Sequence, residues 1–310
     1  MSSTVALLPA ETSLIKFPTY DEFRAYVLRQ CFSIPLSIVY YMAKNPRSAK
    51  VYQKMIRTCK YFFLKNPILV YHCLHYNKNE WKICVNQSCL GPVEDLVYRK
   101  VAMDLKKLES KICVTFTLEI SSSTSTFASS LIQKLYRGNV KSLVLKEQRI
   151  LLEELLFLSN KLKHVCLHES YVYYPGGKQL VPFEVIIATL PMVQAFCIEQ
   201  TNVICDLSKT STELVKIPHF KNLDVFLCRG FDESFDIEKF FEHLKKNQQT
   251  RVYISYTGQL SQEYEEKLDM IIEEILNAEL PRSYIPPFIG YDGQLNDQRE
   301  ILYHLCCEYF

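Results

Sequence analysis

The chain has 310 residues, of which 48% are hydrophobic and 23% are charged, and its formal net charge is +2. This composition is typical of a globular protein, and a chain of this length can bury a sizeable core in one or two domains. It contains no run of about 18 apolar residues, which argues against a transmembrane helix. The N-terminal sequence lacks the basic and apolar regions of a secretory signal, so we expect a soluble protein of the cytoplasm or nucleus.

Three helices are predicted at about residues 20–31, 34–43 and 47–64. Thr19 and Glu22 form a capping-box pattern at the start of the first helix. Pro35 suits the first turn of the second helix. An Asn-Pro pair ends the second helix and another ends the third, because the residue before proline avoids helical backbone angles.

The third predicted helix is amphipathic and strongly basic. Seven basic residues and no acidic residue lie between Lys44 and Lys65. An apolar stripe runs beside a basic stripe, as expected of a helix with one face in the core and one in solvent. The basic stripe is either a solvated surface or a binding site for an acidic partner. A protein partner is favoured over nucleic acid, because exposed aromatic residues and a nucleic-acid-binding motif are lacking.

The N-terminal sequence resembles an F-box. The resemblance rests on FPTYDEFRAYVLRQC, IPLSIVYYM and VYQKMIRTCKYFFLKNP, with Phe17-Pro18 in the place of the family's Leu-Pro and Cys59–Phe62 matching its later Cys-Lys-x-aromatic segment. The resemblance implies that residues 1–70 form a three-helix unit that binds a Skp-type adaptor. The residues expected to make that contact are Phe17, Pro18, Phe23, Ile34, Pro35 and Leu36.

Residues 71–310 contain a recurring pattern, apolar-x-x-apolar-x-apolar. Its central positions are 116, 143, 165, 196, 226 and 252, which are 27, 22, 31, 30 and 26 residues apart. This spacing is close to that of leucine-rich repeats. Helix-like segments lie between the predicted strands, at Ile150–Leu162, Pro182–Thr189, Asp236–Lys246 and Gln262–Ala278.

The fold class predicted from these patterns is α/β, with a three-helix F-box-like unit followed by a leucine-rich-repeat-like strand–helix solenoid. Stacked units would bury faces that one unit cannot cover alone. The alternative is a generic α/β domain whose strands happen to have similar sequences.

Residues that alternate with the buried positions of each strand should lie on the open face of the sheet. We expect this mixed polar and apolar face to bind a protein partner. The residues selected for this role are Lys146, His164, His168, Glu199, Arg229, Arg251 and Tyr253.

Cysteine and histidine patterns give no prediction of a metal or cofactor. The twelve cysteines are expected to be reduced thiols, because the chain shows no secretory signal. His164–His168 places His, Cys and His on one strand face, but no fourth ligand accompanies them. A second group, His72–His75, lies in a mixed apolar segment.

No catalytic residues are predicted, because the sequence has none of the Gly-x-Ser-x-Gly, His-Glu-x-x-His or Gly-x-Gly-x-x-Gly motifs. The expected function is a non-enzymatic one: a substrate-recruiting adaptor of a Skp–cullin–F-box-type ubiquitin ligase. The alternative is a repeat scaffold for protein–protein interaction whose helices only cap the repeats. A third reading is a protein that binds RNA or a membrane surface through its basic helix, which would make binding strongly salt-dependent.

Overall fold

The computed structural model describes residues 19–25, 30–84, 98–201 and 206–307. Contacts divide the chain into two compact units. The first unit comprises Met1–Thr117 and Lys134–Tyr136, and the second comprises Leu118–Gln133 and Arg137–Phe310. The N-terminal helices therefore cluster with the strands that follow them, and a separate segment ending at residue 70 stays a prediction. Phe17 and Pro18 lie outside the described residues.

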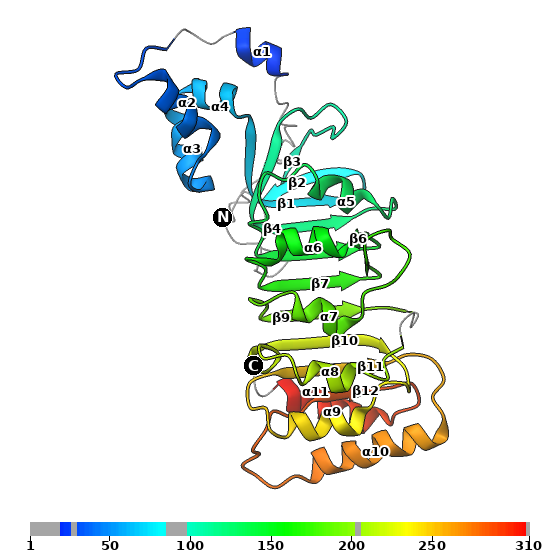
Figure 1. Ribbon diagram of the computed structural model, residues 1–310. Coiled ribbons are helices and arrows are strands. Elements are labelled where there is room, and N and C mark those ends of the chain that lie inside the picture. The colour runs from blue at the N-terminus through cyan, green and yellow to red at the C-terminus, as the bar shows by residue number, and fades with distance from the viewer. Residues whose placement is uncertain (1–18, 26–29, 85–97, 202–205, 308–310) are drawn as a thin grey trace, which may run out of the picture. The chain divides into compact units, whose positions relative to one another are not determined.

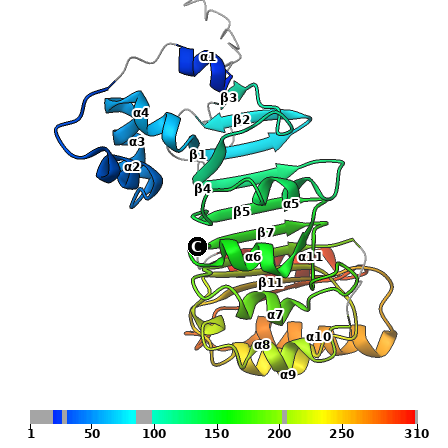
Figure 2. The same cartoon turned by 45° about the horizontal axis from the view of Figure 1, so that its top comes forward.

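The first unit begins with four short helices (Figure 2): α1 (Tyr20–Ala25), α2 (Leu36–Lys44), α3 (Ala49–Thr58) and α4 (Lys60–Lys65). The predicted capping box is confirmed, because Thr19 N donates to Glu22 Oε2 at 2.7 Å and Glu22 N donates to Thr19 Oγ1 at 3.3 Å. The single helix predicted over 47–64 is wrong. Cys59 is extended, with φ −153°, so α3 and α4 are separate helices.

A buried tyrosine joins these helices to the first strand. The Tyr52 hydroxyl donates to the Asn66 carbonyl and accepts from Ile68 N at 3.2 Å. Asn66 in turn donates through Nδ2 to the Ala43 carbonyl at 2.9 Å. Tyr52 and Ile68 also pack with Cys113 in a small apolar core. The helices and strands of the first unit are thus held by polar and apolar contacts around one side chain.

Three strands of the first unit form an antiparallel meander: β1 (Ile68–Asn77), β2 (Glu80–Cys84) and β3 (Tyr98–Val101). Lys78 and Asn79 connect β1 to β2, with φ of 49° and 60°. Two consecutive residues with positive φ are the signature of a type I′ hairpin turn. The turn sets the register in which His75 lies opposite Lys82.

The strands make one ten-stranded sheet in the order β12-β11-β10-β9-β7-β5-β4-β1-β2-β3. Strand β4 (Lys111–Ser121) contributes residues to both units. From β5 to β12 the neighbouring strands of this sheet are parallel. They are β5 (Ser142–Lys146), β7 (His164–His168), β9 (Ala195–Glu199), β10 (Val225–Phe231), β11 (Arg251–Tyr256) and β12 (Phe288–Gly290). A separate parallel pair is formed by β6 (Arg149–Leu151) and β8 (Tyr171–Tyr173).

Helices of the second unit follow its strands and cover mainly one face (Figure 1). They are α5 (Phe127–Ile132), α6 (Leu152–Ser159), α7 (Phe183–Ala188), α8 (Thr210–Leu214), the 3-10 helix η2 (Phe220–Asn222), α9 (Ile237–Leu244) and α10 (Gln262–Asn277). The last helix, α11 (Asn296–Cys307), lies on the opposite face in both views. Alternate strand residues facing the helices, such as Phe196 and Phe226, are fully buried.

The predicted leucine-rich-repeat-like solenoid is wrong. The strands lie where the apolar pattern predicts them, but they belong to a large, mostly parallel sheet that continues into an antiparallel meander. The pattern arises because any parallel strand with one helix-covered face buries alternate residues. The N-terminal helices, with α3 and α4 broken at Cys59, do not form an evident F-box unit either.

Gln148 is the centre of a buried polar network just after β5. Its side chain is fully buried and accepts from Ala128 N at 3.0 Å. Nε2 donates to the carbonyls of Ser122 at 2.9 Å and Lys146 at 3.1 Å. The Gln148 backbone N–H donates to Ser170 Oγ at 2.9 Å. The Gln148 side chain therefore joins backbone groups of Ser122, Ala128 and Lys146, and its backbone N–H adds Ser170 to the network.

We expect Gln148→Leu to lower the free energy of unfolding by about 2–4 kcal/mol, because each buried polar group left unpaired costs about 1–3 kcal/mol. Urea denaturation followed by far-UV circular dichroism measures this loss. The matched control is Gln262→Leu on the exposed surface of α10, which should change stability by less than about 0.5 kcal/mol. Equal effects of the two substitutions would contradict a structural role for the Gln148 network.

Candidate functional site: the open face of the parallel sheet

The parallel strands present three rows of side chains on the face away from α5–α10. Because strand residues alternate and the strands are in register, equivalent positions fall side by side. The first row is Ser142, His164, Ala195, Val225 and Arg251. The second row is Val144, Cys166, Cys197, Leu227, Tyr253 and Phe288. The third row is Lys146, His168, Glu199, Arg229 and Ser255.

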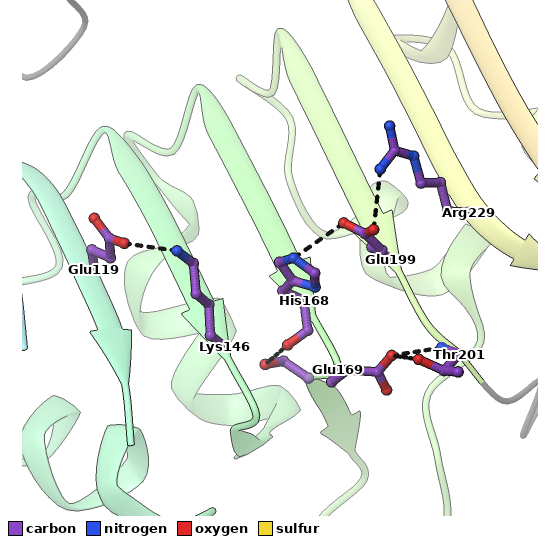
Figure 3. A network of polar contacts seen from close by, with 8 residues as sticks. Glu119, Lys146, His168, Glu169, Glu199, Thr201 and Arg229 are labelled. Carbon is purple, nitrogen blue, oxygen red and sulfur yellow. Dashed lines mark hydrogen bonds and ion pairs between the residues drawn. The ribbon is translucent and has the colours of Figure 1, made fainter. Parts of the chain in front are cut away.

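Together with Glu119 of β4, the third row forms a charged row in which Lys146 pairs with Glu119, and Glu199 pairs with both His168 and Arg229 (Figure 3). Lys146 Nζ lies 3.2 Å from Glu119 Oε1. His168 Nε2 lies 3.2 Å from Glu199 Oε2, and the other carboxylate oxygen of Glu199 accepts from Arg229 at 3.1 Å. These side chains are partly exposed, so their mutual attraction contributes little to stability. The row keeps polar groups of both signs in fixed positions at the surface.

A third acidic residue, Glu169, lies beside this charged row. Glu169 follows β7 with a φ of 44°, a left-handed conformation that is uncommon for residues other than glycine. Its carboxylate accepts from Thr201 N at 2.6 Å and from the Thr201 hydroxyl, as Figure 3 shows. The Tyr171 hydroxyl donates to the other carboxylate oxygen at 3.3 Å. These bonds orient Glu169 beside the His168–Glu199 pair.

The second row is largely apolar and contains two cysteines on neighbouring strands. Cys166 and Cys197 are paired in the sheet register and are both half-buried free thiols. The hydrogen bond from Cys197 lowers the pKa of the Cys166 thiol. The same contact, together with burial, raises the pKa of Cys197 far above its usual value. One thiol of the pair therefore loses its proton more easily than both do.

Where α11 crosses the open face, it encloses a pocket of about 540 Å³. This volume lies in the range of ligand-binding pockets. Its floor comes from the rows, including Leu227 and Tyr253, and Arg299 and Tyr303 of α11 form its wall. The Tyr303 ring meets Phe288 edge-on, with centroids 6.1 Å apart. The pocket thus joins aromatic surface to a guanidinium group.

The structure brings together some of the residues predicted to bind a partner and separates others. Lys146, His168, Glu199 and Arg229 share the charged row. His164 and Arg251 lie in the first row, and burial lowers the pKa of His164. Tyr253 lies in the apolar row and lines the pocket. Whether these residues bind a partner stays a prediction.

Sequence reasoning missed Glu119 of the charged row and the α11 side of the pocket. Glu119 belongs to β4, whose apolar pattern was weaker than those of the later strands. Arg299 and Tyr303 lie on α11, and no predicted strand follows this helix. The alternation of strands and helices therefore gave no reason to place α11 on the open face. The amphipathic pattern of α11 was the available signal, but it does not say which surface the helix covers.

A second candidate surface lies on α2. The predicted adaptor-binding residues Ile34, Pro35 and Leu36 are all exposed there. Phe23 belongs to α1, but its side chain lies outside what the structure describes. Val39 and Ala43 are buried together with Phe62, whereas the other large apolar side chains of α2 face solvent.

Among the described cysteines, one departs from the expectation that they are all reduced thiols. Cys73 is disulfide-bonded, whereas Cys166 and Cys197 are among the free thiols. Among the described residues, the side chains close enough to hold a metal ion together are Cys73, His75 and Cys84. His164–His168, the other pattern noted in the sequence, is not such a group.

No protein-family model matches this chain, and no curated protein matches it either. Within the described residues, every helix is too short or too polar to cross a membrane. The description of the chain as a leucine-rich-repeat ubiquitin-ligase adaptor is not supported, because the sheet is not a solenoid and no link to a ligase is shown.

Replacing Cys197 with Ala should raise the pKa of Cys166, because the hydrogen bond that favours its thiolate is lost. The pH midpoint for alkylation of Cys166 by iodoacetamide should then move to higher pH. Mass spectrometry of the peptide that contains Cys166 measures this midpoint. Cys307→Ala, at another free thiol of the same unit, should leave it unchanged. An unchanged midpoint in Cys197→Ala would show that the pair does not control Cys166.

Proposed function

We propose that this chain is a non-catalytic adaptor that holds two protein partners, one on the α2 surface and one on the open face of the parallel sheet. The observation that carries the proposal is the exposure of the apolar side chains around α2. The partner suggested for this surface is a Skp-type adaptor, as the sequence resemblance implies. The open face of the parallel sheet binds the second protein partner.

The α2 surface consists of large apolar side chains, on and just before α2, that are exposed among the described residues. Their exposed fractions range from 42% to 67%, which is high for large apolar side chains. They are Ile34, Leu36, Ile38, Tyr40, Tyr41 and Met42. Six large apolar side chains exposed within nine consecutive residues are typical of a protein-binding site. Helices that only covered other elements would bury Ile34 and Leu36, so docking is favoured over capping.

Basic residues next to this surface indicate the charge of its partner. Lys44 ends α2, and Lys50, Lys54 and Arg57 are exposed on α3. The N-cap of α3, Ser48, accepts from Val51 N at 3.2 Å, which fixes where this basic helix begins. A partner with acidic residues around an apolar groove would complement the surface in shape and charge.

The open face of the sheet supports a binding role more than a catalytic one. Both carboxylate oxygens of Glu199 are occupied, one by His168 and one by Arg229. A carboxylate held in this way is suited to orienting charged neighbours for recognition. The apolar row beside it supplies contact area that a partner can bury, and the charged row supplies specificity.

The first test is calorimetric titration of the whole chain with a Skp-type adaptor. We expect saturable binding, which Leu36→Asp weakens at least about tenfold, or roughly 1.4 kcal/mol, because it puts a charge into the apolar contact. Met270→Asp is the matched control, because Met270 on α10 has the same exposed fraction, 62%, as Leu36. Absence of binding by the unaltered chain, or equal loss in both variants, would contradict docking at α2.

The second test addresses the sheet face by proximity labelling in cells. The double variant Lys146→Ala/Arg229→Ala removes two cations of the charged row. We expect it to lose a set of labelled proteins that the control variant Lys216→Ala retains. Lys216 is also paired with an acid, Glu213, at 2.6 Å, but follows α8. An unchanged set of labelled proteins would show that the charged row does not recognise the partner.

A further inference from the structure

A Cys–His–Cys cluster lies in the β1–β2 hairpin of the first unit and shares no residue with either proposed docking surface. Cys73 and His75 are two residues apart on β1, so they point to the same side of the strand. Because β1 and β2 are antiparallel with His75 opposite Lys82, Cys84 at the end of β2 comes level with Cys73. The ligand atoms of the three residues all lie within 4.8 Å of one another.

The distances and the donor atoms fit a tetrahedral metal ion. His75 Nε2 lies 3.3 Å from Cys84 Sγ. In a tetrahedral zinc site, with Zn–S of about 2.3 Å and Zn–N of about 2.0–2.1 Å, neighbouring ligand atoms are roughly 3.5–3.8 Å apart. Small side-chain movements therefore suffice to place an ion between them. Two thiolates and one imidazole are ligands that suit zinc and disfavour the hard cations calcium and magnesium.

The environment also favours a bound ion over a solvated cluster. Cys73 and His75 are buried, and Cys84 is half-buried. The Tyr98 ring of β3 meets His75 edge-on at 5.2 Å between centroids, which limits rotation of the imidazole. The described residues supply three ligands, and a water molecule would complete the tetrahedron, as in zinc sites with three protein ligands.

Oxidation of Cys73 controls whether this site can form. Cys73 is disulfide-bonded, and a sulfur in a disulfide cannot also serve as a thiolate ligand. A cellular dithiol or two molecules of a small thiol can reduce this disulfide to two thiols, and the reductant itself becomes a disulfide. Zinc binding then releases one proton each from Cys73 and Cys84, and His75 binds as neutral imidazole.

We propose that Cys73, His75 and Cys84 form a redox-controlled zinc site: the reduced hairpin binds one zinc ion, and oxidation of Cys73 releases it. The site would fix β1 to β2 in the reduced protein. It concerns only the first unit and does not depend on the proposed function.

The test uses the whole chain after reduction, removal of metal with a chelator, and exchange into oxygen-free buffer. Titration with Co²⁺ should saturate at one ion per chain and produce both thiolate-to-cobalt charge-transfer absorption and the strong visible bands of tetrahedral cobalt. Zn²⁺ should remove these bands. The same chain with Cys73 oxidised should bind at least about a hundredfold more weakly, because one thiolate ligand is missing.

Variants identify the ligands. His75→Gln and Cys84→Ser should each weaken Co²⁺ binding at least about tenfold. Cys31→Ser, at an exposed free thiol of the same unit, should bind as the unaltered chain does. Circular dichroism establishes that each variant is folded. If Cys84→Ser does not fold, the proposal is tested by the Co²⁺ affinity of His75→Gln and by the charge-transfer absorption of the unaltered chain. Absence of that absorption in the reduced chain, or equal affinity in His75→Gln, overturns the proposal.

Discussion

One-sided burial of the parallel strands is the constraint on which the rest of the second unit depends. Helices cover one face of the sheet, so every second strand residue must be apolar and buried, as Phe196 and Phe226 are. The residues between them are forced to the other face. Because the parallel strands are in register, these residues line up in rows. The side chain at one position therefore lies beside the side chain at the equivalent position of the next strand.

The alternation of buried and open residues along each strand explains why the open face carries both a charged row and a largely apolar row. Charged residues at the ends of the strands meet as Lys146–Glu119 and His168–Glu199–Arg229, and the row between the two polar rows is apolar. Exposed ion pairs of this type add little stability, so the charged row is more readily understood as a recognition surface. The α2 surface differs, because its apolar residues are exposed although the helix is anchored by Val39 and Ala43.

Strand pairing also accounts for the thiol chemistry of both units. In the second unit, parallel register places Cys166 beside Cys197, where a hydrogen bond makes one thiolate easier and the other harder to form. In the first unit, antiparallel register brings Cys84 to Cys73 and His75. Each group draws its residues from two neighbouring strands. Their reactivity is therefore a property of register and would change if a strand slipped by one residue.

The sequence by itself determined the local features: the capping box at Thr19, the positions of the parallel strands and the alternation that assigns Lys146 and Arg229 to the open face. Periodicity suffices for these because it records which side of an element is buried. Only the tertiary structure decided that the strands form one sheet rather than a solenoid and that α11 crosses its open face. Those outcomes depend on contacts between segments that are distant in sequence. The spacing of apolar residues shows which side of an element is buried, but it does not show which other element covers that side.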